Sequence, residues 1–154
     1  MRFVTDDGNF GFIVTQHGGR HMFRFQLVME GQVIGDAEPS ILGSAMHQFS
    51  SLAQMNDARL SPTVIEPSDI LSVLLTDEDI YDRVLLSSAE SLDQWDIRGY
   101  RINGNAVLLA QQYHDGELSG RIYSAVLQEC QYQELIDMVR HYWNTVNNKM
   151  YTNL

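Results

Sequence analysis

Apolar and polar positions alternate along the first part of the chain, and this pattern predicts a β-hairpin. Phe10, Phe12 and Val14 share one parity, and a second apolar run extends over residues 22–29. A Gly18-Gly19 pair lies between the two runs, as is typical of a tight turn. A second turn after residue 29 predicts a further short strand, so this part of the chain is expected to be β-structure.

Two stripes of apolar residues at helical spacing predict two amphipathic helices. Pro39 and Ser40 mark the start of the first helix, with Ser40 as the expected N-cap. The second helix is expected from about Gln131 to Val146. We expect both stripes to pack on the sheet rather than to bind a partner. The stripes consist of Leu42, Ala45, Met46, Phe49, Leu52 and Ala53, and of Tyr132, Leu135, Ile136, Val139, Tyr142, Trp143 and Val146.

The last part of the region between these helices has a pattern that predicts a β-meander. Asn103-Gly104 separates strands expected at residues 97–102 and 105–113, because both turn positions of this dipeptide favour positive φ. Another turn at residues 114–116 leads into a third strand, expected at residues 118–127. The apolar run at residues 83–88 is too short for periodicity to decide between strand and helix.

The order hairpin, helix, loop, meander, helix predicts an α+β fold. We expect an antiparallel β-sheet (hairpin plus C-terminal meander) covered by two amphipathic helices, with one layer of sheet and one of helix. The chain has 154 residues, of which 44% are hydrophobic, and we expect a single globular domain over residues 1–154.

Composition narrows the compartment and the class of partner. The single cysteine, Cys130, excludes an intrachain disulfide, suits a reducing compartment and is expected to be buried. The chain shows no signal-peptide pattern and no stretch of about 20 apolar residues, so we expect a cytoplasmic protein without membrane contact. We also expect a monomer. Twenty acids against ten bases argue against nucleic-acid binding.

The acidic residues are concentrated in one segment. Residues 57–96 contain ten acids and only two bases, so this segment carries net −8 of the formal net charge of −10. A localised negative field steers and orients a basic partner, and aromatic side chains within it can anchor that partner. The alternative is a solvated acidic surface with no partner. The residues predicted to bind a partner are Asp77, Glu78, Asp79, Tyr81, Asp82, Glu90, Asp93, Trp95 and Asp96.

Other motifs carry little chemistry. The run from His17 to His21 has the composition of an oxyanion-hole loop or a two-histidine metal site, but the chain lacks the G-x-S-x-G nucleophile motif and a defined third ligand. A calcium loop starting at Asp77 would require glycine at position six, where Asp82 stands, and glutamate at position twelve, where Ser88 stands. We therefore expect no catalytic residue, no metal and no cofactor.

Two stretches, residues 25–36 and 88–100, resemble the immunity proteins of bacterial contact-dependent growth inhibition and related polymorphic toxin systems. The first ends in Gly31-Gln32-Val33-Ile34-Gly35-Asp36, and the second is an acidic elbow that leads into a strand; together they cover about a sixth of the chain. The resemblance implies a small cytosolic protein that binds one toxin domain and blocks its active site.

The leading hypothesis is therefore a toxin-neutralising immunity protein with a cognate toxin domain, a basic nuclease, as its partner. One alternative is a small hydrolase or isomerase that uses clustered carboxylates. Another is an adaptor or secretion chaperone, whose usual sign is an exposed apolar groove. The two helical stripes, in contrast, are expected to be fully used by the core.

Overall fold

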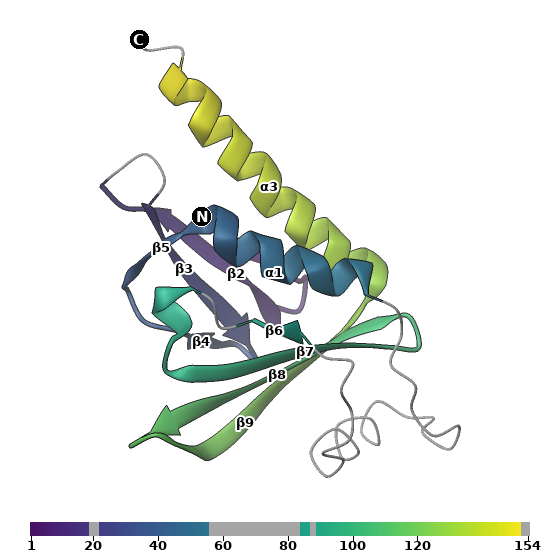
Figure 1. Cartoon of the computed structure of the whole chain (residues 1–154). Helices are drawn as coiled ribbons and strands as arrows, with labels where there is room; N and C mark the ends of the chain where they lie inside the picture. The colour runs from purple at the N-terminus through teal and green to yellow at the C-terminus, as the bar shows by residue number, and fades with distance from the viewer. Residues whose placement is uncertain (19–21, 56–83, 87–88, 152–154) are drawn as a thin grey trace.

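A computed structural model of the chain describes residues 1–18, 22–55, 84–86 and 89–151 (Figure 1). The side chains of residues 84, 85 and 148–151 are not described. In chain order, the elements are β1 (Arg2–Val4), β2 (Phe10–Gln16), β3 (Met22–Met29), β4 (Gln32–Ile34), β5 (Pro39–Ile41), α1 (Leu42–Gln54), β6 (Val84–Leu85), the 3-10 helix η1 (Glu90–Leu92), β7 (Trp95–Ile102), β8 (Asn105–His114), β9 (Glu117–Gln128) and α3 (Glu129–Tyr151).

The described strands form two antiparallel sheets. The first has the order β1-β2-β3-β4, with β5 also paired to β3, and the second has the order β6-β7-β8-β9. Among the described residues, the predicted α+β class with two helices is confirmed, whereas the expectation of a single sheet layer is wrong. One edge of β3 pairs with β2. The other edge pairs with β4 at residues 27–29 and with β5 at residues 22–24. Both edges of β3 are therefore occupied, and the meander forms a sheet of its own.

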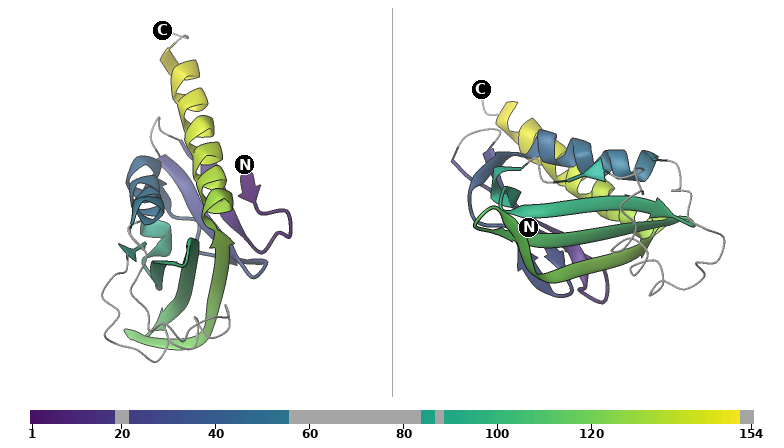
Figure 2. Two further views of the ribbon diagram at one scale, coloured as in Figure 1. Left: turned by 90° about the vertical axis from the view of Figure 1, so that its right-hand side faces the viewer. Right: turned by 60° about the horizontal axis from the view of Figure 1, so that its bottom comes forward.

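The two helices lie on the same side of β2 and β3, while the strands of the second sheet run across the opposite end of the molecule (Figures 1 and 2). The core between the helices and strands β2 and β3 is aromatic. The ring of Phe12 lies 5.3 Å from that of Phe49 in α1 and 5.7 Å from that of Phe25 in β3, measured between centroids. Ile97 and Leu108 of the second sheet belong to the same buried cluster, so both sheets and both helices share one core.

The packing of the two helical stripes is as predicted for most positions. Met46 and Phe49 are buried, as are Leu135 and Val139. The buried hydroxyl of Tyr132 donates a hydrogen bond of 2.7 Å to the carbonyl of Phe49, and burial raises the pKa of this phenol. This bond joins α3 to α1.

The aromatic end of the α3 stripe is less buried than its centre. Tyr142 and Trp143 are half-buried and pack against the core from its edge. The ring of Trp143 lies over Gly43 at the start of α1, where an added Cβ would be 3.5 Å from the indole Cη2.

Turn chemistry confirms the predicted hairpin of the second sheet. Asn103 has φ 50° and Gly104 has φ 74°, and Ile102 pairs with Asn105 across the turn. The ambiguous run at 83–88 forms a short strand at residues 84–85.

Two local expectations are wrong. Ser40 does not cap α1: the N-cap position is Ile41, and Ser40 lies in β5, where its buried Oγ accepts a hydrogen bond of 3.3 Å from the backbone N–H of Ser91. Cys130 is exposed rather than buried, because it lies in the first turn of α3 on the side that faces away from the core.

Candidate binding surface

Within the acidic segment, the structure describes residues 84–86 and 89–96, and η1 in the second of these parts is hydrogen-bonded to the first sheet. Ser91 is 2% exposed and bonds in three directions. Its N–H donates to Ser40, its hydroxyl donates to the carbonyl of Phe25, and its carbonyl accepts a hydrogen bond of 2.9 Å from the N–H of Asp36. Leu92 is buried beside it and packs against Gly35. The two stretches that carry the immunity-protein resemblance are therefore in direct contact.

Ser91 and Leu92 point into the protein, and the acids on either side of these two residues lie on the outside. Glu90 and Asp93 are both exposed. Neither carboxylate forms an ion pair or hydrogen bond with another residue in the described part of the chain. We call residues 90–96 the acidic corner. It offers two unneutralised carboxylates on a rigid support.

Trp95 and Asp96 complete the corner but are engaged within the protein. The Trp95 ring is half-buried and meets the ring of Tyr123 edge to face, with 5.9 Å between centroids. Asp96 accepts a hydrogen bond of 2.5 Å from Nε of Arg98. Burial lowers the pKa of this guanidinium, but its bond and ion pair with Asp96 outweigh burial and raise the pKa overall. The charge of Asp96 is thus balanced internally.

The remaining predicted partner-binding residues lie outside the described residues, and so does most of the His17–His21 turn. Of that turn the structure describes His17 and Gly18, which are both exposed and directly follow β2. Within the described residues, no group of three or more histidine, cysteine, aspartate or glutamate side chains is arranged to hold a metal ion. The predicted binding residues without a described position are Asp77, Glu78, Asp79, Tyr81 and Asp82.

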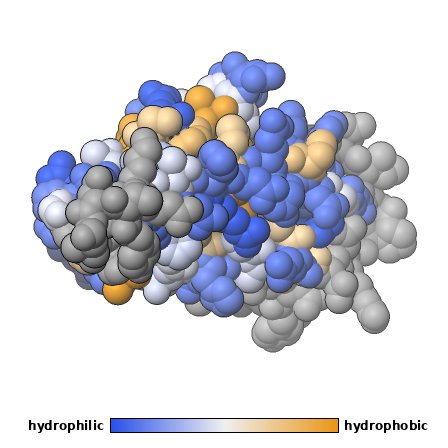
Figure 3. Space-filling view, turned by 90° about the horizontal axis from the view of Figure 1, so that it is seen from above, coloured by the Kyte–Doolittle hydropathy of each residue, from blue (hydrophilic) through white to orange (hydrophobic). Residues whose placement is uncertain are grey.

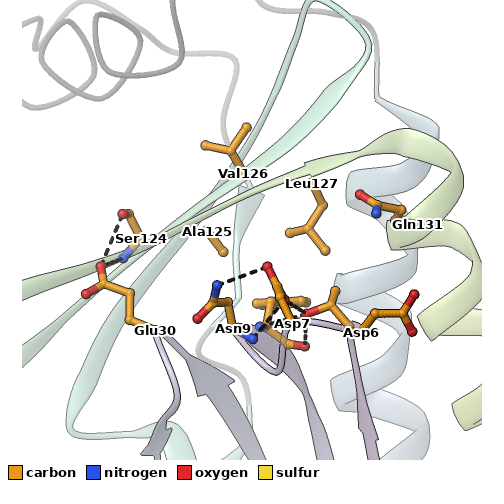
Figure 4. Close-up of a pocket in the computed structure, with 11 residues that line it drawn as sticks. Asp6, Asp7, Asn9, Glu30, Ser124, Ala125, Val126, Leu127 and Gln131 are labelled. Carbon is orange, nitrogen blue, oxygen red and sulfur yellow. Dashed lines mark hydrogen bonds between the residues drawn. The ribbon is translucent and has the colours of Figure 1, made fainter.

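A cleft between the two sheets was not predicted from the sequence (Figure 4). It has a volume of about 420 Å³, and its walls are the β1–β2 turn, Glu30 in the β3–β4 turn, residues 124–127 of β9 and Gln131 of α3. One Glu30 oxygen accepts hydrogen bonds from the Ser124 N–H at 2.9 Å and from its hydroxyl at 3.2 Å. The other oxygen pairs with Arg121. Glu30 therefore connects the first sheet to a residue of the second sheet that lies 94 positions later in the sequence. We call this contact between Glu30, Ser124 and Arg121 the clasp.

The clasp favours the charged form of Glu30. Burial raises the pKa of the Glu30 carboxyl, but the hydrogen bonds from Ser124 and Arg121 outweigh burial and hold the pKa below its ordinary value. The opposite wall contains Asp7, whose carboxylate accepts hydrogen bonds from the Thr5 hydroxyl at 2.6 Å and from the Asn9 N–H at 3.0 Å. These bonds lower the pKa of Asp7, so its carboxylate stays ionised inside its own turn.

A second hollow lies along the outer side of α3. This groove has a volume of about 750 Å³, and its lining includes Met1, Phe3, Met138, Tyr142 and the exposed Cys130. Met138 is 37% exposed. Met138 is not part of the predicted stripe, so α3 carries apolar surface in addition to the side chains that were expected in the core. The face seen in Figure 3 is mainly hydrophilic, with hydrophobic residues in small groups between polar ones.

No family model, curated protein or solved structure matches this chain. Among the helices that the structure describes, none is both long enough and apolar enough to cross a membrane.

Proposed function

We propose that this chain is a toxin-neutralising immunity protein. It acts in the cytoplasm as a monomer, binds one cognate toxin domain with a basic nuclease active site, and blocks that site. The observation that carries the proposal is the concentration of net −8 in residues 57–96, together with the two unneutralised carboxylates at the described end of this segment.

The acidic corner has the features expected of the end of such an interface. Glu90 in η1 and Asp93 directly after it are both exposed, and the three hydrogen bonds of Ser91 hold η1 in place. A rigid support lowers the entropy that is lost on binding. Trp95, which is half-buried, adjoins these acids in sequence and supplies the aromatic element that binding hot spots favour.

The mechanism is occlusion. A negative surface occupies the cationic cleft in which a nuclease binds phosphate, and the nucleic-acid substrate is excluded. Long-range attraction raises association rates by about 10–10³-fold, which favours capture of a toxin before it acts. Affinity depends in addition on aromatic anchors and on shape, because charge alone does not make a complex tight.

The test is surface plasmon resonance against the toxin domain encoded by the gene directly upstream, over a series of salt concentrations. Glu90→Lys with Asp93→Lys should slow association and weaken its salt dependence, since steering between exposed charges is screened over about 8 Å at physiological salt. Reversal of Asp77, Glu78, Asp79 and Asp82 to lysine should act in the same direction. Trp95→Ala should instead speed dissociation.

The matched control is Asp115→Lys with Glu117→Lys, which reverses two exposed acids at the β8–β9 turn. This control should leave association unchanged. If the corner variant associates at the wild-type rate and still protects cells from the toxin, the acidic corner is a solvated surface and the proposal fails.

An adaptor or secretion chaperone is the second candidate, and the apolar groove along α3 is the observation that favours it. The two functions predict different sensitive residues. Met138→Glu would abolish partner binding by an adaptor, whereas it should leave capture of a toxin by the acidic corner intact.

A further inference from the structure

The free edge of β9 faces the cleft between the sheets. In an antiparallel pair, residues alternate between positions whose N–H and C=O point to the partner strand and positions whose groups point away. Ile102 and Asn105 flank a two-residue turn, so Asn105 bonds to β7 and its β9 partner Gln128 points outward. The same alternation makes Val126 and Ser124 outward-facing, as they pair with Val107 and Leu109.

Side chains confirm this orientation at both ends of the cleft. The outward N–H of Ser124 donates to Glu30, and the outward N–H of Gln128 donates to Oε1 of Gln131 at 3.2 Å. Val126 lies between these two capped positions. No described residue caps its N–H or its carbonyl, and its side chain is 37% exposed. Among the described residues that line the cleft, Val126 is thus the position at which the edge of β9 is left open.

We propose that this cleft binds an extended, basic peptide segment, which adds to the edge of β9 at Val126. Edge strands with unpaired backbone groups are templates for strand addition, in which the main chain supplies affinity and the side chains supply selectivity. The cleft shares no residue with the acidic corner, so this site does not depend on the function proposed above.

The charge of the opposite wall selects the occupant. Of the charged residues that the structure describes in the cleft lining, Asp6, Asp7 and Glu30 are all acidic. Asp7 and Glu30 are fixed by hydrogen bonds, whereas Asp6 is exposed at the rim (Figure 4). An arginine or lysine side chain that projects from the added strand would meet this wall. Acidic or neutral segments would gain no such contact.

The experiment measures binding of a synthetic probe by fluorescence anisotropy. The probe is an end-blocked, labelled pentapeptide of alternating valine and arginine, and the comparison peptide has glutamate in place of arginine. Val126→Pro removes the open N–H without breaking a bond to β8, because this N–H points outward. Affinity for the probe should fall about tenfold, the loss expected for one backbone hydrogen bond and its steric fit.

Leu118→Pro is the matched control. Leu118 is also 37% exposed, and its pairing with Tyr113 next to the two-residue turn at Asp115-Gly116 places its N–H outward as well. Leu118 does not line the cleft, so this variant should bind the probe like the wild type. Asp6→Asn should weaken binding and reduce its dependence on salt.

A probe that is N-methylated at alternate residues keeps all charges but loses the donors on one edge, and it tests strand addition without altering the protein. Weak binding of this probe, with normal binding of the unmodified one, supports the proposal even if Val126→Pro does not fold. The proposal is overturned if the methylated probe binds as well as the unmodified probe, if a folded Val126→Pro variant binds the probe as well as the wild type, or if the wild type does not distinguish arginine from glutamate peptides.

Discussion

The clasp between the two sheets can be tested by replacing Glu30 with glutamine. Glutamine keeps an oxygen that can accept hydrogen bonds, but it removes the charge that now receives bonds from Ser124 and Arg121. The backbone of the β3–β4 turn should not change, since glutamine has the same length. The substitution therefore isolates the contribution of the negative charge to the joint between β3 and β9.

The expected cost follows from the geometry of the clasp. A hydrogen bond to a charged group contributes about 1.5–3 kcal/mol, against about 0.5–1.5 kcal/mol for a neutral one, so the bond from the Ser124 N–H should lose about 1 kcal/mol. The ion pair adds little, because the Arg121 side chain is 64% exposed. For a chain of 154 residues, a loss of about 1 kcal/mol lowers Tm by about 2–4 °C.

The pH dependence supplies the sharper test. The pKa of Glu30 is lower in the folded state than the ordinary value of 4.5, so its stabilisation is fully present above pH 4.5 and is lost as the pH falls through the folded pKa. The difference in Tm between wild type and Glu30→Gln should be constant at neutral pH and shrink in acid. Scanning calorimetry across this range measures it, with Glu117→Gln as the control, because Glu117 is an exposed carboxylate on β9, the strand that Glu30 contacts. A Tm difference that does not change with pH would refute the reasoning.

The other stability predictions concern how the elements are anchored. Ser91→Ala should cost about 1–3 kcal/mol, because the hydroxyl that bonds the carbonyl of Phe25 is buried, and urea denaturation should show a lower midpoint at an unchanged slope. An unchanged midpoint would mean that this bond does not hold η1. Trp143→Ala should cost less than the roughly 3–5 kcal/mol of a fully buried tryptophan, since the ring is half-buried, whereas Leu135→Ala should cost about 2–5 kcal/mol. Leu135→Ala should therefore be the more destabilising of the two. Thermal melts that show a larger loss of stability for Trp143→Ala would contradict this assignment of the core.

The elements predicted correctly are those whose signal is local. Asn103-Gly104 specifies its turn because both residues adopt positive φ with little strain, and the flanking strands follow from it. Phe49 and Val139 lie within helical stripes that bury one face. In these cases neighbouring residues contain the whole physical reason for the structure.

The features that were missed depend on contacts between distant parts of the chain. Ser40 has the chemistry of an N-cap, but its hydroxyl bonds to Ser91, 51 residues away, and this contact draws it into β5. The occupation of both edges of β3, which divides the strands into two sheets, is likewise invisible to periodicity. The sequence predicts the turn after residue 29, but the role of Glu30 in that turn depends on Ser124, which no local pattern could indicate.

The acidic corner and the cleft are physically connected, and this bears on how Trp95 is interpreted. The Trp95 ring contacts Tyr123, Arg121 lies 5.1 Å from the centroid of that ring, and Arg121 also pairs with Glu30 at the cleft. Removing the Trp95 ring would therefore disturb the support of the clasp as well as the acidic corner. Tyr123→Leu separates the two effects, because it removes the packing partner but keeps the indole. If Trp95→Ala speeds dissociation of a toxin and Tyr123→Leu does not, the indole itself contacts the toxin. If both variants act alike, Trp95 serves binding only by holding β7 and β9 in place.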